Sequence, residues 1–177
     1  MKKILITILI ITMGGIVAYY LFSRIMKQTQ KLSSEALFRS VAEINNNEKG
    51  VESQCSYSTE KFDCTYTIGA GTALGTASGR IALRADLDGD GSEDAVVQKY
   101  SCGASCSGST EVILNQNGKA RNIGFLIYKP SKEVAPYPKM LQQVRFENGI
   151  LTVIFQNIAQ QTDETRYKIV GDKIITL

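Results

Sequence analysis

The chain has 177 residues and a net charge of +3, and its apolar (44%) and charged (21%) fractions are those of an ordinary globular protein. It contains no histidine, which excludes Ser-His-Asp and Cys-His catalysis and any histidine-ligated zinc site. Lys2 and Lys3 supply two of the 20 basic residues, so the chain after Phe22 is almost neutral against 17 acidic residues and lacks the basic stripe of a nucleic-acid-binding protein.

An uncharged hydrophobic run, Ile4–Phe22, follows the two N-terminal lysines. About twenty apolar residues span a bilayer as a helix, whereas the hydrophobic region of a signal peptide is usually about 7–15 residues long. No A-x-A cleavage pattern follows the run. We therefore expect residues 1–22 to be a signal-anchor, a single transmembrane helix that contacts the membrane through residues 4–22. The alternative is a signal peptide whose cleavage leaves a secreted protein, and both readings export the rest of the chain.

The pattern stays helical after the hydrophobic run. Apolar residues recur at steps of three, four and seven from Ser23 to about Asn46, and Asn45–Asn47 and Gly50 end the pattern. This spacing predicts an amphipathic helix or stalk within residues 23–50 that continues the N-terminal helix.

From Val51 the apolar residues alternate with a period of two, which predicts β-strands. Asn117-Gly118, Asn148-Gly149 and Gly171-Asp172 lie between alternating runs and predict tight hairpin turns. The glycine-rich stretch Gly69–Gly79 is expected to be a loop, and Lys129–Lys139, which holds all three prolines, a surface connection. The expected strands are Val51–Tyr57, Phe62–Ile68, Arg80–Ala85, Ala95–Tyr100, Glu111–Asn115, Asn122–Tyr128, Gln143–Phe146, Ile150–Gln156, Thr165–Val170 and Lys173–Leu177.

These elements predict an α+β fold. A hydrophobic N-terminal helix continues into an amphipathic helix, and a mainly antiparallel sheet built of hairpins follows. Residues 51–177 then form one β-rich, disulfide-containing, extracytoplasmic domain.

Four cysteines occur as two close pairs, Cys55 with Cys64 and Cys102 with Cys106. An even number of cysteines in an exported chain predicts disulfides, and proximity favours pairing within each pair among the three possible connectivities. Disulfides would place the domain on the oxidising side of the membrane. A four-thiolate zinc site is the rival reading, although only Cys102 and Cys106 have the usual spacing of such a site. A redox centre is disfavoured because no C-x-x-C motif is present.

The most acidic stretch, Asp86–Asp94, holds five of the 17 acidic residues. Carboxylates on alternate positions of a tight turn repel one another unless a cation binds between them. Calcium takes six to eight oxygen ligands, and a loop of the EF-hand type supplies them from positions 1, 3, 5, 7 and 9, with glycine at position 6. Asp86, Asp88, Asp90, the Ser92 carbonyl and Asp94 occupy those ligand positions. The alternative is a polar turn that needs no metal, since Asp and Gly are favoured turn residues.

The pattern D-x-D-G-D-G-x-x-D between two apolar strands resembles the calcium loops of FG-GAP (VCBS) repeats and of dockerin-like and other EF-hand-like motifs. The resemblance implies that a calcium ion is bound by Asp86, Asp88, Asp90, Asp94 and the Ser92 carbonyl. It covers only residues 80–100 in a single copy, so a propeller of many such repeats is excluded. Position 12, a bidentate Glu in the true EF-hand, is Val97 here. We therefore expect weak, extracellular-type affinity, in the range of high micromolar to millimolar calcium.

These features favour a membrane-anchored extracytoplasmic binding module with structural calcium and an unidentified extracytoplasmic protein partner. No nucleotide is expected, because no phosphate loop with Gly-Lys-Ser/Thr is present. The second candidate is a pilin-like subunit of a surface filament, although the chain lacks the glycine cleavage site and the glutamate that pilins carry. A proteinaceous enzyme inhibitor, or an exported hydrolase using Asp86 or Glu93, is the third. No catalytic residue is assigned, and a non-enzyme is expected.

Overall fold

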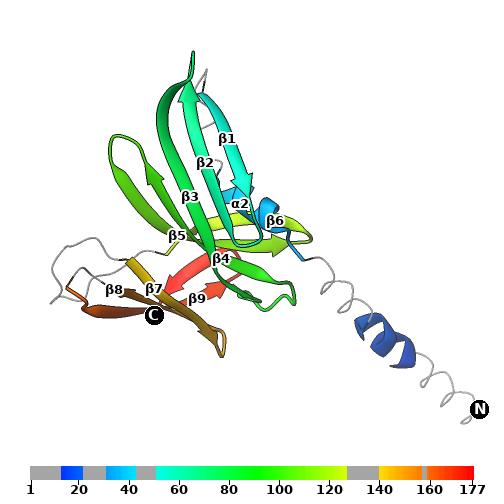
Figure 1. The fold of residues 1–177 in the computed structure, drawn as a ribbon. Helices are drawn as coiled ribbons and strands as arrows, with labels where there is room; N and C mark the ends of the chain where they lie inside the picture. The colour runs from blue at the N-terminus through cyan, green and yellow to red at the C-terminus, as the bar shows by residue number, and fades with distance from the viewer. Residues whose placement is uncertain (1–12, 22–30, 43–50, 127–139, 157–158) are drawn as a thin grey trace, which may run out of the picture.

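The computed structural model describes residues 13–21, 31–42, 51–126, 140–156 and 159–177. In these ranges, ten strands form two antiparallel sheets (Figure 1). Within each sheet consecutive strands are paired, and the change of sheet falls between β6 and β7. The six-stranded sheet contains β1 (Val51–Tyr57), β2 (Lys61–Ile68), β3 (Thr72–Ala85), β4 (Asp94–Cys102), β5 (Cys106–Gln116) and β6 (Lys119–Phe125). The four-stranded sheet contains β7 (Met140–Glu147), β8 (Ile150–Gln156), β9 (Thr162–Val170) and β10 (Lys173–Thr176), in the order β10-β9-β8-β7.

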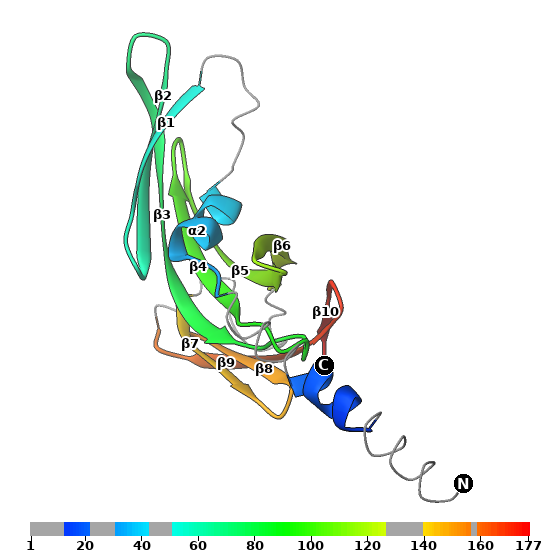
Figure 2. The same ribbon diagram turned by 90° about the vertical axis from the view of Figure 1, so that its right-hand side faces the viewer.

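One helix, α2 (Ser34–Ala42), lies on the concave side of the bent six-stranded sheet, and the four-stranded sheet lies beneath the lower part of the larger one (Figure 2). The period-two pattern explains this arrangement, because alternate residues of the central strand β4 enter different cores. Ala95 and Val97 pack with α2, whereas Val96 packs with the four-stranded sheet. The predicted α+β class and the antiparallel sheet of hairpins are confirmed.

The hairpin turns follow the backbone preferences of their residues. Asn117 and Gly118 have φ angles of 56° and 82°, and Asn148 and Gly149 have 53° and 74°. Positive φ at both central residues defines a type I′ turn, whose twist matches that of the flanking strands. These two-residue turns fix the register of β5 with β6 and of β7 with β8.

The loop predicted at Gly69–Gly79 is present only as the turn at Gly69–Gly71; the rest of the prediction is wrong, because β3 begins at Thr72 and pairs with both β2 and β4. The small residues serve close packing within the sheet. A side chain at Gly79 would overlap the ring of Phe62, which crosses β3 at this point. That ring contacts Phe38 of α2, with ring centroids 5.2 Å apart. Glycine in β3 therefore makes room for the aromatic pair that joins the helix to the sheet.

The helix predicted within residues 23–50 is present as α2, but the expectation that it continues unbroken from the N-terminal helix is wrong at residues 31–33. Residues 31–33 are not helical, and Ser33 caps α2 by accepting the Ala36 N–H at its Oγ (3.1 Å). Residues 22–30 and 43–50, like 127–139 and the C-terminal end of the strand predicted at Asn122–Tyr128, lie outside the described residues.

The described part of the N-terminal segment is a helix at residues 13–21, and all of its residues are exposed. Among the described residues, no helix has the length and apolar character needed to cross a membrane. Residues 4–12 and 22 of the predicted membrane segment lie outside the described ranges.

Candidate metal site

The acidic loop connects the two central strands of the larger sheet. β3 ends at Ala85 and β4 begins at Asp94, and these two residues are partners in the antiparallel register. Leu87, within the loop, is 3% exposed and packs in the core between the two sheets. The loop is therefore held against the core near its start, by Leu87, and at its end, where β4 begins, while Gly89 and Asp90 between them are exposed.

Asp94 is the most buried carboxylate of the loop, with 1% of its surface exposed. Its Oδ2 accepts the Leu87 N–H and its Oδ1 accepts the Asn115 N–H of β5, both at 2.8 Å. Burial raises the pKa of Asp94 to about 6; the two N–H donors oppose this rise, and the charges of Asp88 and Asp90 add to it. Asp94 thus joins the loop to β5, and its charge is incompletely compensated when no cation is bound.

The first half of the loop is shaped by carboxylates that accept backbone N–H groups. Asp86 accepts from Gly89 at 2.8 Å and from Gly91 at 3.0 Å, and Asp88 Oδ1 accepts the Asp90 N–H at 3.1 Å. Gly91 has a φ of 89°, which favours glycine at position 6, the position where the backbone of the loop must turn. These bonds curl the backbone around its own acidic side chains.

Three of the four predicted carboxylates converge. One oxygen from each of Asp86, Asp88 and Asp94 lies within 4.8 Å of the other two. Calcium binds oxygen at about 2.3–2.6 Å, so two oxygens on opposite sides of one ion are about 4.6–5.2 Å apart. The separation of the three carboxylate oxygens is compatible with a single ion between them. Burial raises the pKa of Asp88, although the Asp90 N–H opposes this, and the neighbouring Asp90 and Asp86 charges add to the rise. The spacing and chemistry of these donors fit a hard divalent cation, and calcium binding itself stays a prediction.

The other two predicted ligands lie around this cluster. Asp90 is exposed, lies outside the group of three, and accepts the Ser92 N–H at its Oδ1 (2.7 Å). Ser92 is 5% exposed, and the predicted ligand there is its backbone carbonyl. The structure thus brings together Asp86, Asp88 and Asp94, and it places Asp90 and Ser92 in the adjoining turn.

Glu93 turns away from the cluster toward the helix. Its Oε1 lies 3.1 Å from Arg84 Nη1 and 3.5 Å from Lys31 Nζ. Arg84 also donates to Ser34 Oγ at 3.0 Å and to the Leu32 carbonyl at 3.5 Å, at the start of α2. Arg84 thus links Glu93 of the loop to the start of α2, by an ion pair on one side and hydrogen bonds on the other. Sequence spacing did not predict this link, because only the fold brings Arg84 close to Ser34.

Both predicted disulfides, Cys55–Cys64 and Cys102–Cys106, are confirmed. Each joins residues directly opposite each other in the register, across β1 and β2 and across β4 and β5. None of the described cysteines is free, so the four-thiolate zinc site is wrong.

The raised pKa of Asp94 has a consequence for pH. A carboxyl group with a higher pKa in the folded state contributes stability that is present at low pH and lost as the pH rises through about 6. In chelator, we expect this group to make the protein more stable at pH 5 than at pH 7 by about 1 kcal/mol, because part of the effect is already lost between pH 4 and pH 5. Thermal melts of Asp94→Asn supply the reference, since the variant lacks this titration. A wild-type pH profile identical to that of Asp94→Asn would contradict the assignment.

Comparison with known proteins identifies no relative: no protein-family model, curated protein or solved structure matches the chain.

Proposed function

We propose that the chain is a membrane-anchored extracytoplasmic binding module whose β-domain is stabilised by one calcium ion. The observation that carries the proposal is the convergence of the Asp86, Asp88 and Asp94 carboxylates within 4.8 Å at the junction of β3 and β4. Three carboxylates this close, one of them almost fully buried, repel one another, and a bound divalent cation removes that repulsion.

The position of the cluster supports a structural role for the ion. Each of the three carboxylates already accepts backbone N–H groups, and those bonds fix the loop rather than present a reactive group to solvent. A cation here would hold together the ends of β3 and β4 and, through Asp94 and the Asn115 N–H, β5 as well. The proposed role of calcium is therefore to stabilise the centre of the larger sheet.

Two features support an extracytoplasmic location. The structure contains two disulfides, and disulfides form and persist mainly in oxidising compartments. The hydrophobic run Ile4–Phe22 supplies the export signal and the proposed anchor. A weak calcium site suits this location, since extracellular modules bind calcium in the range of about 0.1–1 mM. The pilin-like alternative gains no support, because the long continuous helix that favoured it is interrupted at residues 31–33.

Calcium is expected to raise the thermal stability of the full-length chain in detergent. At a free calcium concentration of 100 times the dissociation constant, binding to the folded state alone adds about 2.7 kcal/mol. The measurement is a melting curve in calcium and in chelator, for the wild type and for Asp88→Asn.

Glu93→Gln is the matched control for this experiment. It removes one negative charge from the same loop but leaves the three clustered carboxylates intact. We expect Glu93→Gln to keep the calcium-dependent rise in melting temperature and Asp88→Asn to lose most of it. An equal response of the two variants would refute a site built on the cluster.

A further inference from the structure

A cavity of about 370 Å³ opens on the side of the larger sheet that carries α2, away from the acidic loop. Its walls come from β1 and β2, from the first part of β3, and from the hairpin between β4 and β5 that Cys102–Cys106 closes. Its volume lies within the range of small-molecule sites, about 300–1,000 Å³. Neither the acidic loop nor the proposed calcium role uses this cavity.

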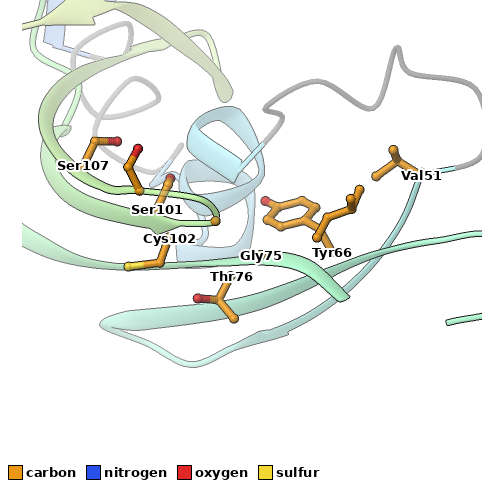
Figure 3. A pocket seen from close by; sticks show the side chains of 10 residues that line it. Val51, Tyr66, Gly75, Thr76, Ser101, Cys102 and Ser107 are labelled. Atoms are coloured by element: carbon orange, nitrogen blue, oxygen red, sulfur yellow. The ribbon is translucent and has the colours of Figure 1, made fainter. Parts of the chain in front are cut away.

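Tyr66 and a pair of serines face each other across the cavity. The Tyr66 ring extends from β2 toward the β4–β5 hairpin, where Ser101 and Ser107 lie (Figure 3). Ser101 and Ser107 are direct partners across β4 and β5, so their side chains lie on one face of the sheet. Ser105, at the tip of the hairpin, adds a third hydroxyl to the wall. The cavity thus combines one aromatic face with several groups that both donate and accept hydrogen bonds.

Gly75 lies in the wall of the cavity, where β3 meets the β4–β5 hairpin. It is the register partner of Tyr66 in β3, and a side chain there would overlap the Cys102 carbonyl. The backbone of the disulfide-closed hairpin can therefore approach β3 closely while the ring remains beside an open space.

Among the residues that the structure describes, none of those that line the cavity is charged. Although 21% of the residues in the chain are charged, none is charged in Cys64–Gly79 or in Tyr100–Thr110. The two stretches are adjacent in the sheet, where Ala77 pairs with Ser101. Lys99 directly precedes the second stretch, but its side chain is buried. Its Nζ donates to the Val41 carbonyl at 3.0 Å and lies 3.8 Å from Glu111 Oε1. The ligand that this lining suits is therefore uncharged.

Hydroxyl-rich walls and an aromatic face suit a ligand that itself has hydroxyl groups and flat apolar patches. Burial raises the pKa of Tyr66, so its side chain remains uncharged. A phosphate or carboxylate would lose its hydration without gaining a cationic partner, and a purely apolar ligand would leave the serine hydroxyls without partners. We propose that the cavity binds a segment of a neutral oligosaccharide, with Tyr66 stacking on a sugar ring and Ser101, Ser105 and Ser107 bonding to its hydroxyls. This proposal rests on the proposed function in that it names the ligand class of the binding module.

The test is a titration of the full-length chain in detergent with two neutral tetrasaccharides, cellotetraose and chitotetraose, followed by calorimetry. A charged series, tetragalacturonate and the deacetylated chitosan tetramer, serves as comparison. We expect at least one neutral probe to bind with a dissociation constant on the order of 1 mM or tighter, and the charged probes to bind at least about tenfold more weakly.

The variant Tyr66→Leu should weaken binding of the neutral probe by about tenfold or more, because it removes the stacking face. Tyr100→Leu is the matched control, since the side chain of Tyr100 lies on the opposite face of β4 from Ser101. Ser107→Glu is a second test that spares the core, because Ser107 is exposed; the added charge should abolish binding.

Binding of neither neutral probe would overturn the proposal, as would equal weakening by Tyr66→Leu and Tyr100→Leu. Melting of the same variants in calcium and in chelator is read in parallel. A chain that keeps its calcium response but binds no neutral glycan overturns only this inference, whereas loss of the calcium response in the wild type contradicts the proposed function itself.

Discussion

Replacing Asp94 with alanine is expected to destabilise the calcium-saturated protein by about 4–5 kcal/mol, the largest effect of any substitution in the loop. The change removes the acceptor for two buried backbone donors, the Leu87 N–H and the Asn115 N–H. It also removes the most buried member of the carboxylate cluster, so the stabilisation by calcium is lost as well. In chelator only the hydrogen-bond part remains, and we expect a loss of about 2 kcal/mol.

Denaturant unfolding in calcium and in chelator separates these two contributions. Asp94→Asn is the matched variant, since it keeps one acceptor oxygen and removes the charge. We expect it to lose the whole calcium effect; in chelator at pH 7 it should cost clearly less than alanine, because it keeps an acceptor oxygen and removes a charge whose burial raises the pKa of Asp94. If Asp94→Ala lowers the free energy of unfolding by the same amount with and without calcium, then Asp94 has only a structural role and binds no ion.

The second large effect is expected at Lys99, where Lys99→Met should cost about 3–5 kcal/mol. The Lys99 side chain is buried beneath α2, where its Nζ donates to the Val41 carbonyl at the end of the helix and lies 3.8 Å from Glu111 Oε1. Burial lowers the pKa of Lys99, and Glu111 partly offsets this. Methionine fills a similar volume but leaves the Glu111 carboxylate buried without its cation and the helix end without its donor.

A double-mutant cycle with Glu111→Gln tests whether the cost arises from the stranded charge. We expect Lys99→Met combined with Glu111→Gln to be clearly more stable than Lys99→Met alone, because glutamine carries no charge and can still bond to Ser109 and Asn122. Strictly additive effects would show that the two side chains act independently and that the cost of Lys99→Met does not arise from the Glu111 charge.

Period-two alternation and turn chemistry were sufficient to predict most of the sheet. The strand predicted at Ile150–Gln156 has the observed bounds, and Asn117-Gly118 and Asn148-Gly149 form the predicted turns. Local signals succeed here because a two-residue turn fixes the register between neighbouring strands. The division into two sheets was not predicted, since it depends on which face of β4 each later strand covers.

The errors occur where tertiary packing overrides local preference. The start of β3 has the composition of a loop, yet Gly79 is required because Phe62 lies across it. The helical pattern after Phe22 extends over residues 31–33, where the described chain instead provides the Ser33 cap of α2. The spacing of apolar residues does not reveal that the Phe62 ring approaches Gly79 closely. It also does not reveal which of the neighbouring serines caps the helix.

The candidate site was predictable in part because its ligands lie in one short loop. Spacing alone pointed to Asp86, Asp88 and Asp94, which the fold brings together. Spacing gave no reason to separate Asp90 from them, since its Oδ1 instead accepts the Ser92 N–H in the turn. Spacing also gave no reason to direct Glu93 to Arg84, because that ion pair depends on how β3 and the loop fold. The cavity beside Tyr66 was not predicted, since its walls come from strands far apart in the sequence.

The most direct test of the central claim is equilibrium dialysis of the full-length chain in detergent against radioactive calcium. The account predicts one ion per chain, with a dissociation constant of about 0.1–1 mM, and none for Asp86→Asn combined with Asp88→Asn. Glu52→Gln combined with Asp63→Asn, on β1 and β2, removes the same charge at a distance from the loop and should leave binding unchanged. The same weak calcium uptake by the wild type and by the loop variant would contradict the account, because the ion would then bind elsewhere or only through net charge.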